Sequence, residues 1–348
     1  MSTEPDDHDA HLPESAIAGA ALHVADILAL AIEHPPGYPA LIVADTASRL
    51  ARGLAEAYRR CLPDAAYVDF DASGPIVTRA ALDFMPAGAL VVLVQSTSFR
   101  LDAFRIRVEL FRRGLKVIEH PHLARMRGDE ALVYLDALAY DPAYYRGVGA
   151  ALKARIDVAQ TASIESVAGS LVFPAGLEPA KLNVGDYRNL PNVGGQYPIG
   201  EVFTESRVLM AVHGRATIAF FGDTQFNVQR PPRPIHLTFE GGRVVGVEHT
   251  TDEFERVLAN IRADEVDVMV RELGFGLNRA FNLDRTVRDI GTFERMCGVH
   301  LSLGQKHASY AKPDVDKKTA RHHVDVFVAA ETVSLDGQVV YRDGAWDP

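Results

Sequence analysis

Residues 320–328 read Ala-Arg-His-His-Val-Asp-Val-Phe-Val, and apolar and polar side chains alternate after His322. This alternation predicts a buried β-strand, because successive side chains of a strand point to opposite faces. His323 and Asp325 therefore lie on the same face. An imidazole and a carboxylate held side by side form half of a metal site, and they also form ordinary structural hydrogen-bonded pairs. The pair alone does not decide between these interpretations.

Short β-branched segments interrupted by glycine precede this strand in the second half of the chain. The pattern changes near Ala162, and an amphipathic helix is predicted over residues 251–263. These features predict a strand-rich α+β domain, the metal-binding domain, over residues 176–348. Its strands are predicted at 166–173, 208–212, 217–221, 235–239 and 244–247, with a hairpin turn at 240–243 and a glycine-rich connection at 191–195.

Apolar strands and helices alternate in the first half of the chain, which predicts an α/β N-terminal domain with a mainly parallel sheet over residues 14–175. No glycine-rich nucleotide motif follows the first strand, so a nucleotide site is not supported. Residues 1–13 are acidic, lack apolar periodicity and are predicted to be a disordered tail. Strands are predicted at 40–45, 67–70, 90–94 and 115–119, and helices at 15–34, 49–61 and 101–113.

The composition indicates which kinds of molecule the protein is expected not to bind. The chain has 348 residues and a formal net charge of −10, which disfavours binding to nucleic acid. The longest apolar run, residues 89–94, is too short to span a bilayer, and the start of the chain lacks a signal-peptide pattern. Cys61 and Cys297 do not make a disulfide framework. These features predict a cytoplasmic protein that binds neither nucleic acid nor membrane.

Four short stretches of the second half carry side chains of metal-ligand type. Three carboxylates and two imidazoles are more than one mononuclear site uses, whereas two divalent cations that share a carboxylate use all five. Nitrogen and oxygen ligands without thiolate suit zinc, cobalt or manganese. The spacing between the stretches is irregular and does not by itself identify a metal motif. The five side chains are Glu201, Glu272, His300, His323 and Asp325, and a tight Gly-x-Gly turn is predicted at 274–276.

These stretches resemble, in the same order, the motif series of the thermophilic-type metalloaminopeptidases, the aminopeptidase T and aminopeptidase S family. They are Gly-Glu-Val-Phe-Thr at 200–204, Glu-Leu-Gly-Phe-Gly-Leu-Asn at 272–278, Gly-Val-His-Leu-Ser-Leu-Gly at 298–304, His-Val-Asp at 323–325 and Thr-Val-Ser-Leu-Asp-Gly at 332–337. The resemblance implies a homodimer with two divalent metal ions that hydrolyses an amide or N-terminal peptide bond of a small-molecule or short-peptide substrate. It also implies that all five side chains are metal ligands, with the bridging carboxylate left open.

One position departs from the family pattern. The family usually has a catalytic Tyr seven residues after the motif His, where this chain has His307, and Tyr310 lies three residues further on. Either side chain is able to stabilise an oxyanion by donating a hydrogen bond, and Glu201 and Glu272 are the candidates for proton transfer. The change also leaves open a binding protein or a specialised biosynthetic enzyme that kept the metal site.

The sequence also resembles the 2,5-dihydroxypyridine ring-cleaving dioxygenases, which hold one Fe(II) with two His and one Asp. In that family a His stands at the position of Glu272, and the positions of Glu201 and His300 are not ligand types. His323 and Asp325 are common to both families. The complete five-residue set therefore favours the dinuclear hydrolase over the mononuclear iron oxygenase.

Overall fold

The computed structural model describes residues 11–97, 99, 101, 106–313, 315 and 318–348. The chain divides into two compact units, Met1–Pro142 with Gly185–Ile199, and Ala143–Val184 with Gly200–Pro348. These bounds differ from the expected domains at 14–175 and 176–348. Most of helix α6 (Pro142–Val158) belongs to the second unit, whereas residues 185–199 return to the first. The expected tail at 1–13 lies mainly outside the described residues, although Leu12 is described and is buried.

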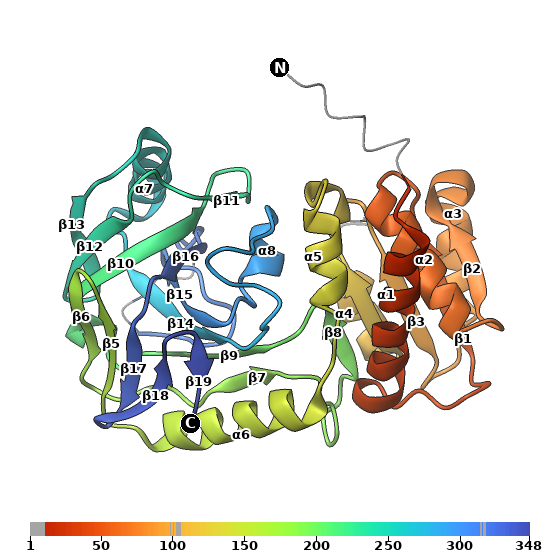
Figure 1. Ribbon diagram of the computed structural model, residues 1–348, viewed down its shortest axis with the longest axis horizontal. Coiled ribbons are helices and arrows are strands. Elements are labelled where there is room, and N and C mark those ends of the chain that lie inside the picture. The colour runs from red at the N-terminus through yellow and green to blue at the C-terminus, as the bar shows by residue number, and fades with distance from the viewer. Residues whose placement is uncertain (1–10, 98, 100, 102–105, 314, 316–317) are drawn as a thin grey trace. The chain divides into compact units, whose positions relative to one another are not determined.

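The first unit is built on a parallel sheet with the strand order β2-β1-β3-β4-β8 among the described residues (Figure 1). β1 and β3 are buried along their whole length, as in parallel sheets that are covered on both faces. The α/β architecture is confirmed. The elements are α1 (Glu14–Asp26), the π-helix η1 (Ile27–Ala31), β1 (Ala40–Ala44), α2 (Arg49–Cys61), β2 (Ala66–Asp69), α3 (Phe70–Asp83), β3 (Leu90–Val94), α4 (Ile106–Arg112), β4 (Lys116–His120), the 3-10 helix η2 (Leu123–Arg125), α5 (Glu130–Asp136) and β8 (Gly194–Gln196).

The glycine-rich segment at 191–195 is more than the predicted connection, because it enters strand β8. Gly194 has a φ of +104°, which favours glycine, and a Cβ at this position would overlap the carbonyl oxygen of Val117 in β4. The absence of a side chain lets the two backbones pair as neighbouring strands. The sequence signal for a turn was in fact a signal for close approach.

The first helix is unusually apolar. Glu14–Ala31 has a mean hydropathy of 1.4 over 18 residues, so it is long and apolar enough to cross a membrane by length and composition. This is weak evidence, because a core helix or a signal sequence meets the same criterion. In the first unit the helix packs against α2 and α5, and Glu14 forms an ion pair with Arg60 of α2. The expectation of no membrane partner stays a prediction.

The second unit is strand-rich, as predicted. Within the described residues its main antiparallel path runs β19-β18-β17-β5-β6-β10-β16-β15-β14-β9-β7, and β11, β12 and β13 attach through β10 (Figure 1). Besides α6, the elements are β5 (Ala162–Ser166), β6 (Gly169–Phe173), β7 (Lys181–Asn183), β9 (Glu201–Glu205), η3 (Leu209–Ala211), β10 (His213–Gly222), β11 (Val228–Gln229), β12 (Ile235–Glu240), β13 (Arg243–Glu248), α7 (Asp252–Glu265), β14 (Val270–Gly276), α8 (Ile290–Phe293), β15 (Gly298–Leu303), β16 (Val324–Val328), β17 (Thr332–Leu335), β18 (Gln338–Arg342) and β19 (Ala345–Trp346).

Two local predictions in this unit are wrong. The predicted strand at 208–212 is instead the 3-10 turn η3, in which the N–H groups of Ala211 and Val212 bond to the carbonyls of Val208 and Leu209 and not to a neighbouring strand. Residues 274–276 form the end of strand β14 and not a tight turn. A Cβ at Gly274 would overlap the His300 imidazole, and one at Gly276 would overlap the Met296 carbonyl. Both glycines therefore permit close packing beside the strand.

Candidate metal centre

Four adjacent strands carry the ligand-type side chains. β9, β14, β15 and β16 are consecutive neighbours in the antiparallel sheet. His300 on β15 lies directly opposite Gly274 on β14, so the missing side chain leaves room for the imidazole. The positions on the strands are Glu201 at the start of β9, Glu272 within β14, His300 within β15, Asp325 within β16 and His323 immediately before β16.

All five predicted ligands meet in one cluster, and they form two groups of three that share Glu272. The first group contains Glu201, Glu272 and His300, and the second contains Glu272, His323 and Asp325. Within each group the ligand atoms lie within 4.8 Å of one another. His300 Nε2 lies 3.4 Å from Glu201 Oε1 and 3.4 Å from Glu272 Oε1. The sheet therefore brings together residues that lie 124 positions apart in the sequence, from 201 to 325.

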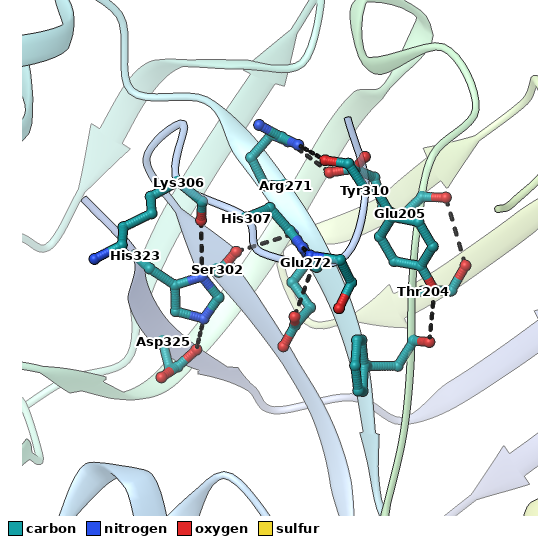
Figure 2. A network of polar contacts seen from close by, with 12 residues as sticks. Thr204, Glu205, Arg271, Glu272, Ser302, Lys306, His307, Tyr310, His323 and Asp325 are labelled. Atoms are coloured by element: carbon teal, nitrogen blue, oxygen red, sulfur yellow. Dashed lines mark hydrogen bonds and ion pairs between the residues drawn. The ribbon is translucent and has the colours of Figure 1, made fainter. Parts of the chain in front are cut away.

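His323 and Asp325 face each other beside Glu272 (Figure 2). His323 Nδ1 lies 3.1 Å from the carbonyl oxygen of Lys306, which can only accept a hydrogen bond, so Nδ1 carries the proton. The lone pair of His323 Nε2 then faces Asp325 Oδ1 at 3.2 Å. Two electron-rich atoms at this distance require a proton or a metal cation between them. A backbone carbonyl that orients a histidine in this way is typical of metal ligands.

Several polar atoms of the cluster lack good partners. Over the part of the chain that the structure describes, His300 Nε2, His307 Nε2 and Asp325 Oδ1 are buried without a hydrogen bond of acceptable geometry. An unsatisfied buried polar group costs about 1–3 kcal/mol. Cations placed among the carboxylates and imidazoles remove this cost for His300 Nε2 and Asp325 Oδ1, so the residues present fit a metal group.

The charges of the cluster are strongly coupled. Burial opposes the ionised carboxylate of Glu272, but contacts with His300 and His307 hold its pKa well below the ordinary value. Burial likewise opposes the charged imidazole of His300, and Glu201 and Glu272 nevertheless raise its pKa. For His323, the charge of Asp325 outweighs burial and raises the pKa to about 10. The carboxylates of the cluster therefore favour a positive charge beside them.

The structure separates the two candidates for the oxyanion donor. His307 Nε2 lies 2.9 Å from Glu272 Oε2, and His307 Nδ1 accepts a hydrogen bond from the backbone N–H of Ser309. In the neutral ring the proton therefore lies on Nε2, which makes His307 a donor and not a ligand. Tyr310 lies on the far side of Glu272 from His323, and its hydroxyl donates to the carbonyl of Pro179 at 2.7 Å (Figure 2). Of the two, only His307 reaches the cluster.

A buried ion pair that was not predicted from the sequence supports the loop of His307. Arg271 Nε lies 2.5 Å from Glu205 Oε2, and the two side chains are 2% and 0% exposed. The same guanidinium donates to the backbone carbonyls of Gln305 and Tyr310. The available signal was a charged residue inside an otherwise apolar strand, because buried arginines are almost always paired.

A second missed residue is Arg295, which follows α8. Its side chain is 8% exposed, and Nη1 lies 3.1 Å from Glu201 Oε2. The same nitrogen also pairs with Glu294, whose pKa is raised to about 8 by burial. Nothing in the local sequence indicates this contact, since α8 and β9 lie far apart in the chain.

Comparisons with known proteins bear on the fold. No family model matches the chain, and no curated protein is similar to it. A solved structure, wild-type AmpT from Thermus thermophilus, is similar with a TM-score of 0.53 and 16% identity, over 94% of this chain and 99% of that chain. At this level of identity the similarity is one of fold alone.

Proposed function

We propose that this protein is a metal-dependent hydrolase of the aminopeptidase type with a dinuclear centre. The observation that carries the proposal is the pair of three-residue groups that share Glu272. Two divalent cations about 3.5–4 Å apart with a common carboxylate are a recurrent arrangement in aminopeptidases and phosphatases. Glu272 would contribute to both groups, and zinc, cobalt or manganese would suit the nitrogen and oxygen donors.

The residues of the cluster have separate roles in this proposal. When bound, the two cations polarise the scissile carbonyl and lower the pKa of the attacking water. Glu201 or Glu272 accepts the proton of that water and passes it to the leaving amine. His307 donates a hydrogen bond from Nε2 to the oxyanion. Glu201, Glu272, His300, His323 and Asp325 hold the metal ions.

The donor set favours hydrolysis over ring cleavage. Each ligand group found among the described residues has two carboxylates and one imidazole. The non-haem iron oxygenases use two histidines and one carboxylate. The fold that the chain shares with AmpT also supports the aminopeptidase reading. A short-peptide or other small-molecule substrate, a homodimer and a cytoplasmic location belong to the same proposal.

Metal analysis together with peptidase assays tests the proposal. The purified protein is expected to hold two zinc, cobalt or manganese atoms per chain and to release the N-terminal residue of aminoacyl amides or dipeptides. Glu272→Ala and His323→Ala are expected to lose metal and activity. The matched control is His213→Ala, because His213 is exposed at the start of β10 and lies outside the cluster.

Three outcomes contradict the proposal. Unchanged metal content in Glu272→Ala and His323→Ala rejects the assigned ligands. One iron per chain with oxygen consumption on hydroxylated pyridines supports the oxygenase. Two bound metals without turnover of any amide support a binding protein or a specialised biosynthetic enzyme.

A further inference from the structure

Arg295 places a fixed positive charge beside one of the two ligand groups. Its guanidinium contacts Glu201 Oε2 at 3.1 Å, while the other oxygen, Oε1, faces His300. One oxygen of Glu201 is therefore engaged by arginine, and one remains for a cation. The backbone around Arg295 is fixed too, because its carbonyl accepts a hydrogen bond from the N–H of Asn278.

The second group has no such counter-charge. Asp325 forms an ion pair with His323, and over the described part of the chain no lysine or arginine pairs with it. The imidazole of the second group is also more accessible to solvent than that of the first, because 30% of the His323 side chain is exposed against 1% of the His300 side chain. Both groups share the charge of Glu272, so the difference in fixed positive charge between them comes from Arg295.

We infer that Arg295 makes the two metal positions unequal, so that the Glu272–His323–Asp325 group binds its cation first and the Glu201–Glu272–His300 group binds its cation more weakly. This inference rests on the proposed dinuclear centre. Two effects have the same sign: the guanidinium repels a cation through a medium of low effective dielectric, and it occupies a carboxylate oxygen that would otherwise bind metal.

Glu294 supplies an internal control on the charge. Its carboxylate pairs with the same nitrogen of Arg295 and is partly exposed, with 20% of its side chain accessible. Burial raises the pKa of Glu294 to about 8, so its carboxyl is mostly neutral at pH 7 and Glu294→Gln changes little charge beside Glu201, whereas removing Arg295 abolishes the positive charge. Only the substitution of Arg295 is therefore expected to move the weaker affinity.

The experiment is a calorimetric titration of the chelator-treated protein with Co²⁺, combined with elemental analysis after gel filtration. The wild-type protein is expected to bind two ions in separate steps, and His323→Ala is expected to remove the tighter one. At pH 7, Arg295→Met is expected to tighten the weaker step by about tenfold or more, and Glu294→Gln to leave it unchanged. The tighter step is expected to change little in both variants.

Equal affinities in the wild-type protein, or an unchanged isotherm in Arg295→Met, overturn the inference while leaving the dinuclear proposal in place. A weaker second step in Arg295→Met also overturns it, because Arg295 then supports Glu201 and does not compete with the cation. Absence of Co²⁺ binding in the wild-type protein defeats the proposed function itself. Should Arg295→Met fail to fold by circular dichroism, Arg295→Gln, which keeps polar atoms but no charge, decides by the same shift of the weaker step.

Discussion

Hydrogen bonds distinguish His307 from Tyr310, although the two residues are equivalent candidates by position. The Nδ1 atom of His307 is held by the N–H of Ser309, and Nε2 is directed to Glu272. The hydroxyl of Tyr310 is engaged by the carbonyl of Pro179, and burial raises its pKa above the ordinary value. Tyr310 is thus held by backbone carbonyls away from the cluster. His307 is the candidate that can donate a hydrogen bond to a substrate oxyanion in the proposed mechanism.

Replacing each residue separately tests this assignment. His307→Ala is expected to lower kcat by about 10²–10³, as when an oxyanion donor is removed, with the metal content unchanged. Tyr310→Phe is expected to lower kcat much less, because the lost hydroxyl donates to the backbone carbonyls of Pro179 and Phe203. Steady-state kinetics and elemental analysis of both variants provide the measurement. A larger loss in Tyr310→Phe would return the donor role to the tyrosine.

Strand β14 carries both a candidate metal ligand, Glu272, and a residue of a buried ion pair, Arg271. Glu272 of this strand belongs to the candidate metal cluster, and its neighbour Arg271, at an irregularity in the pairing with β15, forms an ion pair with Glu205 of β9. Gly274 and Gly276 on the same strand leave room for His300 and for the backbone of Met296. The strand therefore explains the glycine pattern and the buried arginine together.

An added methyl group at Gly274 tests the close approach. Gly274→Ala is expected to displace the His300 imidazole, to lower metal content and to destabilise the fold by about 1–3 kcal/mol. The control is Gly147→Ala within α6, where an added Cβ meets no atom within 4 Å. That substitution is expected to be neutral or to stabilise by up to about 1 kcal/mol, through helix propensity. Denaturant titration and metal analysis of both proteins give the comparison.

The buried ion pair of β14 and β9 is expected to be costly to break. Arg271→Ala is expected to lower the free energy of unfolding by about 3–5 kcal/mol, because Glu205 loses its main counter-charge. Hydrogen exchange at residues 305–310 is expected to accelerate, since the guanidinium also holds two carbonyls of that loop. The exposed pair Arg215–Glu248 is the reference, and Arg215→Ala should cost about 1 kcal/mol or less. Equal losses in the two variants would argue against a structural role for the buried pair.

The whole molecule consists of two units with different buried polar systems. The second unit holds the metal cluster, and the first holds a fully buried histidine, His120, at the end of β4. Tyr58 OH lies 2.7 Å from His120 Nε2, and Tyr134 OH lies 2.7 Å from Nδ1. Tyr134 donates its own proton to the carbonyl of Tyr197, so it accepts from Nδ1–H and Tyr58 donates to Nε2. This chain of bonds satisfies a neutral imidazole.

Acid is expected to destabilise the first unit through His120. Burial lowers its pKa to about 3, whereas the unfolded chain has an ordinary value of about 6.5. Between these values the unfolded state binds the extra proton, so the contribution to stability falls as pH decreases, by about 1.4 kcal/mol per pH unit. Hydrogen exchange of the β3 and β4 amides at several pH values measures the stability of the first unit. Trp346 fluorescence reports the unfolding of the second unit, as a comparison. The same slope in His120→Gln would show that other groups cause the acid sensitivity.

The sequence by itself determined the order and type of most elements and the set of candidate metal ligands. Apolar runs such as residues 90–94 and the amphipathic pattern of 49–61 match β3 and α2 in their bounds. The five ligand types followed from the motifs, because those side chains have few other reasons to stand in apolar strands. The glycine signals at 191–195 and 274–276 were mistaken for a simple connection and a turn, because glycine marks close approach as readily as a bend.

Tertiary structure alone decided how these residues work together. The sharing of Glu272, the choice of His307 over Tyr310 and the pairing of Arg295 with Glu201 all depend on contacts between elements distant in sequence. The return of residues 185–199 to the first unit and the burial of Arg271 also depend on such contacts. Sequence periodicity reports which face of an element is buried, but not which element it meets there. Distances of a few ångströms between side chains, which fix charge, protonation and metal binding, arise only when the strands pair.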